Sequence, residues 1–187
     1  MKKHHLVLAA VAAIALLAGT ALAEKKAEKL KSGPQVGEKL AGPFYPLNIN
    51  GEKAGQKHCL YCQNGDKPVA MIFARQISPA LTTLIKKVDA VNEKNKEQMG
   101  SFVVFLGEQE DLEKDLKKLA EESGLKNIVL SIDNPAGPKG YNVSKDADIT
   151  VVLYVERTCK VNHAYAKGGL NEKDVEGIVA ELPTILK

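Results

Sequence analysis

The stretch Val69-Ala70-Met71-Ile72-Phe73-Ala74 decides the interpretation of the fold, because it is an unbroken apolar run of strand length. It follows Pro68 directly, and polar residues separate it from the next apolar pattern. A short apolar run between turn residues is typical of a strand that is buried on both of its faces. We therefore expect residues 69–74 to form a buried strand of a sheet.

Downstream of this run, helical and strand patterns alternate. Ser78 can cap a helix that has Pro79 at its first position, and apolar residues at helical spacing follow. The sequence then predicts a strand over 101–106, a charged amphipathic helix over about 108–123 and a third strand over 127–132. Strands that alternate with helices in this way favour a mainly parallel sheet.

The last third of the chain predicts an antiparallel addition to this sheet. Residues 149–155 are a further apolar run, 156–160 read as a polar turn, and 161–166 have the pattern of the returning arm of a hairpin. Asn171 is a candidate cap for a last helix that ends near residue 182. The complete order predicts an α/β fold with a mixed sheet and helices on both faces.

The first 23 residues have the three parts of a secretory signal peptide. Lys2 and Lys3 give a positive start, residues 6–17 are apolar, and Ala21-Leu22-Ala23 fits an A-x-A cleavage site. The apolar stretch is shorter than the roughly 18–20 residues that span a bilayer. Thr20 stands where a lipoprotein would carry its cysteine, so lipid attachment is not expected. The sequence predicts an exported protein, periplasmic or secreted, with no stable membrane anchor after cleavage.

Cleavage after residue 23 leaves 164 of the 187 residues, which suits one domain. We expect a flexible lead-in over 24–34 and a single domain over 35–187. Two of the 26 basic residues and none of the 23 acidic ones lie in residues 1–23, so the mature chain carries a net charge of +1. This near-neutral balance gives no electrostatic reason to expect a nucleic-acid partner.

The order of these features resembles the thioredoxin-like superfamily. The likeness is nearest to its exported thiol-disulfide oxidoreductases and its peroxiredoxin-like (alkyl hydroperoxide reductase/thiol-specific antioxidant) members, and it covers about residues 35–186. The segments that carry it are 36–40, 47–51, 140–143, 149–155 and 168–171. The resemblance implies a three-layer sandwich, thiol-disulfide chemistry on protein thiols or disulfides, and no cofactor.

The sequence departs from the family at the usual position of the active-site cysteines. The resemblance places these cysteines after the central strand, at Ile77 and Ala80, and the peroxide-attacking cysteine of a peroxiredoxin in the same loop. In the same register, Ile149 stands where the family has a cis-proline. The usual active-site cysteines are therefore expected to be missing.

The chain has its own Cys-x-x-Cys pair, Cys59 and Cys62, which precedes the strand predicted over 69–74. Cys159 lies in the turn after strand 149–155. In a thioredoxin sheet these two strands are antiparallel neighbours, so both cysteine segments are expected at one end of the sheet. His58 precedes Cys59, and His163 follows Cys159 by four residues. All cysteines and histidines of the mature chain are then expected along one rim of the molecule, at this end of the sheet.

Three interpretations of this cluster remain open, so enzymatic activity is itself uncertain at this point. In the first, Cys59 and Cys62 are catalytic: Cys59 attacks because it is expected to be the more exposed, His58 favours its thiolate, and Cys159 resolves or shuttles. In the second, Cys59, Cys62, Cys159 and His163 bind zinc or copper, because four soft ligands suit a tetrahedral site. In the third, a disulfide is only a structural clip.

Overall fold

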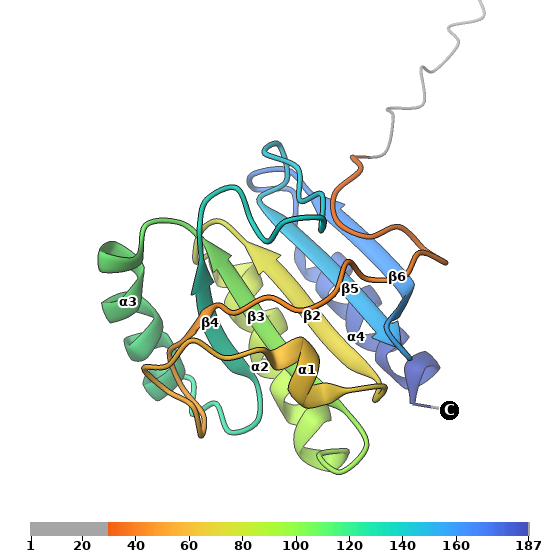
Figure 1. Cartoon of the computed structure of the whole chain (residues 1–187), viewed down its shortest axis with the longest axis horizontal. Coiled ribbons are helices and arrows are strands. Elements are labelled where there is room, and N and C mark those ends of the chain that lie inside the picture. Colours follow the sequence, from red (N-terminus) through yellow and green to blue (C-terminus); the bar gives the residue numbers. More distant parts are fainter. Residues whose placement is uncertain (1–29, 187) are drawn as a thin grey trace, which may run out of the picture.

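The computed structural model describes residues 30–186, so the predicted signal peptide at 1–23 lies outside the described residues. The described chain forms one six-stranded sheet in the order β1-β4-β3-β2-β5-β6 (Figure 1). None of the helices in this range is long and apolar enough to cross a membrane. The strands are β1 Leu47–Asn48, β2 Val69–Ala74, β3 Gly100–Leu106, β4 Val129–Asp133, β5 Ile149–Val155 and β6 Thr158–Tyr165, and the helices are α1 Leu60–Asn64, α2 Pro79–Lys94, α3 Gln109–Glu122 and α4 Glu172–Ile185.

The predicted α/β architecture with a mixed sheet is confirmed. Strand β2 is buried along its whole length. It runs parallel to β3 on one side and antiparallel to β5 on the other. Strand β4 continues the parallel part, and β1 and β6 are antiparallel to their neighbours. Two elements, the five-residue α1 and the two-residue β1, have no counterpart in the sequence prediction.

Helix α2 begins where the sequence predicts it to begin. The Ser78 side chain accepts a hydrogen bond from the Leu81 N–H at 3.2 Å, and Pro79 occupies the first turn, where its missing N–H costs nothing. The apolar side of the helix packs on the sheet through Leu84, Ile85 and Val88. The local cap and the helical spacing together are sufficient to place this helix.

The hairpin of β5 and β6 is tighter than predicted. Strand β6 starts at Thr158, three residues before the predicted arm, because the turn consists only of Glu156 and Arg157. Both residues have positive φ, at 49° and 61°. Two-residue hairpin turns favour this backbone conformation because its twist matches that of the strands. The predicted polar turn over 156–160 is therefore wrong in its length.

Each face of the sheet has its own core. On the back face, α2, α3 and α4 cover alternate residues of β2, β3 and β5. On the front face, α1 is the one helix within residues 30–186; residues 32–48, which we call the strap, and the loop before β5 with Tyr141 cover the rest (Figure 1). Helices were predicted on both faces. The front layer contains the short helix α1 but consists mostly of extended chain.

The strap joins the two edges of the sheet. Lys39 forms a β-bridge with Thr158 of β6, and Leu47 pairs with Ile132 of β4. Ser32, which the sequence assigned to a flexible lead-in, is 1% exposed, and its hydroxyl lies 2.6 Å from that of Thr150. The ordered domain therefore includes residues that were expected to be part of the lead-in.

Candidate functional site

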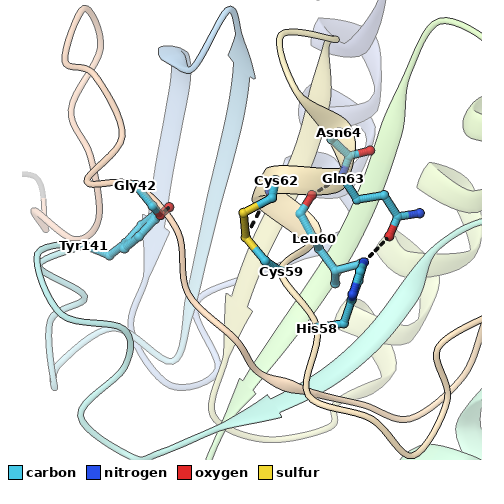
Figure 2. Close-up of a disulfide and its surroundings, with 8 residues drawn as sticks. All are labelled: Gly42, His58, Cys59, Leu60, Cys62, Gln63, Asn64 and Tyr141. Atoms are coloured by element: carbon cyan, nitrogen blue, oxygen red, sulfur yellow. Dashed lines mark hydrogen bonds between the residues drawn. A yellow bond between two sulfur atoms is a disulfide. The ribbon is translucent and has the colours of Figure 1, made fainter.

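The two cysteines of the Cys-x-x-Cys pair form a disulfide at the start of α1 (Figure 2). Cys59 is the N-cap of this helix, and its Sγ accepts a hydrogen bond from the N–H of Cys62 at 3.1 Å. Ser, Thr, Asp or Asn usually fill this position, because the first N–H groups of a helix have no partner inside it. One side chain therefore both caps the helix and closes the disulfide.

Helix α1 is held against the front face by its own residues. Leu60 and Tyr61 are 3% and 6% exposed and belong to the front core. The Asn64 side chain donates to the Leu60 carbonyl at 2.8 Å, and Gly65 ends the helix with a φ of 58°. A positive φ suits glycine, which has no Cβ. The disulfide is thus carried by a packed element.

The two sulfur-bearing residues differ in accessibility, and in the opposite sense to the prediction. Cys59 is 3% exposed, because its side chain lies in the front core, whereas Cys62 is exposed. The expectation that Cys59 is the more exposed of the two is wrong, so the attacking role predicted for Cys59 loses the argument on which it was based. Cys62 is the member of the pair that a thiol from outside can approach.

An open cleft of about 610 Å³ borders the disulfide. Both cysteines line it, together with Tyr45, Lys53 and Lys57. Tyr45 is 61% exposed, so most of its side chain is accessible beside the disulfide. Sequence reasoning missed Tyr45, since nothing in the sequence pattern distinguishes it from the buried aromatic residues.

His58 also lines this cleft, but its ring bonds elsewhere. Its Nε2 lies 3.0 Å from Oε1 of Gln63, and Figure 2 shows the ring directed toward Gln63. Among residues 30–186, no hydrogen bond joins His58 to the sulfur of Cys59 or Cys62. In this arrangement His58 orients Gln63 at the cleft, and its predicted influence on the Cys59 thiolate stays a prediction.

Cys159 lies at the predicted end of the sheet. It pairs with Tyr154, which in turn pairs with Val69 at the start of β2, and it belongs to the same front core as Cys59. It is a free thiol with 0% exposure, and its S–H donates to the Val161 carbonyl at 3.4 Å. Burial, with a smaller contribution from the charge of Glu38, raises the pKa of Cys159 to about 11. A resolving role remains a prediction, and it requires this residue to become exposed.

His163 lies on the other face of the sheet. Its Nε2 is 2.6 Å from a carboxylate oxygen of Glu181 on α4, which covers the back face. Residues four apart on a regular strand share a face. Here the register shifts between Tyr154–Cys159 and Leu153–Val161, which inserts an extra residue and changes the face.

The zinc or copper interpretation is therefore not supported. The predicted ligands Cys59, Cys62, Cys159 and His163 are divided between the two faces, and the first two are bonded to each other. In the described part of the chain, no group of three or more His, Cys, Asp or Glu residues is arranged to hold a metal ion. The expectation that one rim gathers every cysteine and histidine is wrong for His163.

Comparison with solved structures shows that the fold is thioredoxin-like. A candidate protein disulfide isomerase from Bacteroides thetaiotaomicron superposes with a TM-score of 0.62 at 16% identity, over 84% of this chain and 94% of that one. A candidate thiol:disulfide interchange protein DsbE from Chlorobium tepidum gives 0.61 at 16% identity, over 85% and 100%. Peroxidoxin BcpB from Mycobacterium tuberculosis gives 0.56 at 15% identity, over 84% and 99%. No protein-family model and no curated protein sequence matches the chain.

These neighbours include thiol:disulfide proteins and a peroxiredoxin, and the chain carries a Cys-x-x-Cys pair of its own. The expectation that active-site cysteines are missing therefore does not hold for the chain as a whole. What differs from the pattern that the resemblance implies is position: the pair precedes β2, and residues 75–80 between β2 and the first turn of α2 contain no cysteine.

Proposed function

We propose that this chain is an exported protein that exchanges disulfides with thiols of other proteins through Cys59 and Cys62. The observation that carries the proposal is a disulfide with one buried and one exposed member at an open cleft. The fold that the chain shares with thiol:disulfide proteins agrees with this chemistry. The signal-peptide pattern of residues 1–23 supports a periplasmic or secreted location.

The exchange begins at the accessible sulfur. A substrate thiolate attacks Sγ of Cys62, a new disulfide forms between the two, and the bond from Cys62 to Cys59 breaks with its electron pair on Sγ of Cys59. A second substrate thiolate then attacks the substrate sulfur and releases Cys62 as a thiolate. The substrate dithiol is oxidised to a disulfide, and the protein is reduced to its dithiol. The reverse sequence reduces a substrate disulfide.

The N-cap position prepares Cys59 for the role of leaving group. The N–H of Cys62 already points at Sγ of Cys59 at 3.1 Å, and hydrogen bonds to an anion are about twice as strong as neutral ones. The charge that develops on Cys59 is thus met by a donor that is in place before the reaction. Burial of Cys59 works against this charge, so the hydrogen bond offsets part of the cost of desolvation.

The test compares the two cysteines in an insulin reduction assay with dithiothreitol as the reductant. We expect Cys59→Ser and Cys62→Ser each to abolish turnover. Cys59→Ser leaves an exposed thiol at 62, which should form a mixed disulfide with an activated peptide disulfide at least about tenfold faster than the buried thiol left by Cys62→Ser. Wild-type turnover in Cys62→Ser would refute the proposal. Sequencing of the mature N-terminus, expected at Glu24, tests export separately.

A structural clip is the second candidate, because Cys59 is both buried and the cap of α1. A disulfide across three residues of sequence closes a small loop, and loop closure of this size contributes about 2 kcal/mol. If the disulfide is only a clip, reduction lowers the melting temperature and the insulin assay shows no turnover with either redox form.

A further inference from the structure

A second cavity, of about 330 Å³, lies at the end of the sheet where β3 and β4 begin. Its walls come from segments that are distant in sequence: β1 and the loop after it, α1, the end of α2, and the residues that precede β3 and β4. Figure 1 shows where these elements lie. The surface of this cavity is mostly polar, and asparagine side chains form much of it. It therefore differs from the cleft beside the disulfide.

Two buried asparagines that line this cavity each have a side-chain oxygen without a hydrogen-bond partner among the described residues. Asn48 is 1% exposed and Asn92 is 3% exposed, and Oδ1 of each has no hydrogen-bond partner within residues 30–186. The Nδ2 of Asn92 donates to the Ser101 hydroxyl at 2.7 Å, so only the oxygen of this amide is unpaired. Buried polar groups are almost always paired, because an unpaired one loses its bonds to water without replacement. A ligand group that reaches these two oxygens from the cavity would supply the missing donor.

Positive charge surrounds the same cavity. Four lysines line it against one acid, Glu52, and all five of these residues are exposed. None of the four ammonium groups makes an ion pair with a carboxylate of residues 30–186. The pKa of nearby Glu93 is lowered chiefly by the hydrogen bond from the Asn127 side chain, and to a smaller extent by the charges of Lys126 and Lys96. The four lysines are Lys53, Lys67, Lys96 and Lys126.

We propose that this cavity binds a small organic anion that also carries hydroxyl or amino groups. The lysines attract and bind the anionic group at the rim, and the hydroxyl or amino groups donate to the amides of Asn48 and Asn92. An anion without hydroxyl or amino groups, such as sulfate, would leave the two amide oxygens without donors. A neutral polyol would leave the lysines without a counter-charge.

This site does not rest on the proposed thiol exchange. It shares Glu52, Lys53 and Gln63 with the disulfide cleft, but neither cysteine lines it. Loss of ligand binding and loss of turnover in the insulin assay are therefore separate outcomes.

The test is calorimetric titration of the protein, with its disulfide intact, with citrate, D-gluconate, L-glutamate and D-glucose 6-phosphate. At least one of these anions is expected to bind at one equivalent with a Kd of about 1 mM or below, and D-glucose and inorganic sulfate at least about tenfold more weakly. The double variant Lys96→Glu/Lys126→Glu should weaken binding by about tenfold or more. The matched control is Lys86→Glu, which makes the same charge change on the exposed side of α2, away from the cavity, and should leave the Kd unchanged.

A second variant tests the cavity floor. Asn92→Leu/Ser101→Ala removes the amide and its hydroxyl partner together, so no further buried polar group loses its hydrogen bond. This double variant should also abolish ligand binding. If this variant does not fold, the rim variant still decides the question. The proposal is overturned if none of the four anions binds below about 10 mM, or if binding is the same in the rim variant as in Lys86→Glu. The cavity would then hold ordered water alone.

Discussion

The thiol of Cys159 should be almost unreactive in the folded, oxidised protein. It is the one cysteine outside the disulfide among the three in the sequence, so alkylation of the oxidised protein reports on it alone. The thiolate is the reactive form. Burial raises the pKa from the ordinary value of 9.0 to about 11, which lowers the thiolate fraction at pH 8 by a factor of about 100. The Cys159 side chain is 0% exposed, which lowers the alkylation rate further, because the reagent reaches the thiol only when the edge strand opens locally.

The assay is iodoacetamide labelling at pH 8, followed by mass spectrometry, with a cysteine peptide as the reference. We expect labelling at least about 100-fold slower than that of the peptide, and a rate that still rises with pH above 9. In 6 M guanidinium chloride the rate should return to that of the peptide. Labelling of the folded protein at the peptide rate would refute the argument, and it would support the resolving role that the sequence predicts for Cys159.

The same shift makes stability depend on pH. The folded-state pKa of Cys159 lies above the unfolded value, so the folded protein holds this proton more tightly. The resulting stabilisation is complete below pH 9 and is lost as the pH rises through 11. Cys159→Ala should therefore show a smaller decrease in the free energy of unfolding between pH 9 and 11 than the wild type.

Three further predictions concern stability and can be checked by urea unfolding. Asp89→Ala should lower the free energy of unfolding by about 3–5 kcal/mol. The carboxylate of Asp89 is 8% exposed and accepts hydrogen bonds from the backbone N–H groups of residues 126, 127 and 128. The control Asp89→Asn keeps one acceptor oxygen and should lower the free energy of unfolding clearly less. Tyr141→Phe should cost about 1–2 kcal/mol, since the hydroxyl donates to the Gly42 carbonyl at 2.7 Å and fixes the strap; no change would mean that the strap is held by packing alone. Glu156→Gly should be neutral or stabilise by up to about 1 kcal/mol, because this exposed residue has a φ of 49°; clear destabilisation would contradict the strain that we assign to the turn.

The sequence was sufficient for those elements whose signals are local. The apolar run of β2 and the cap at Ser78 are read from consecutive residues, and the structure confirms both. Helix α1 and strand β1 escape prediction because five and two residues are too few to show a period. Their conformations depend on the front face of a sheet whose strands come later in the chain.

The candidate site was predicted in composition but not in orientation. The pairing of two antiparallel strands correctly placed Cys159 at the same end of the sheet as the start of β2. One extra residue in β6 turned His163 to the back face, and such a register shift has no signature in this sequence. The exposure of Cys62 and the burial of Cys59 follow from how α1 docks, which is a tertiary property.

The strap also constrains the order in which the molecule can assemble. The Ser32 hydroxyl meets Thr150, 118 residues later, and the Asn162 side chain, 130 residues later, donates to the Ser32 carbonyl. Contacts between such distant residues form slowly. When the chain is synthesised from its N-terminus, Ser32 has no binding partners until β5 and β6 have been made. A chain that stops before β6 would leave the N-terminal part of the strap without the hydrogen bonds from Asn162 and without the bridge between Lys39 and Thr158.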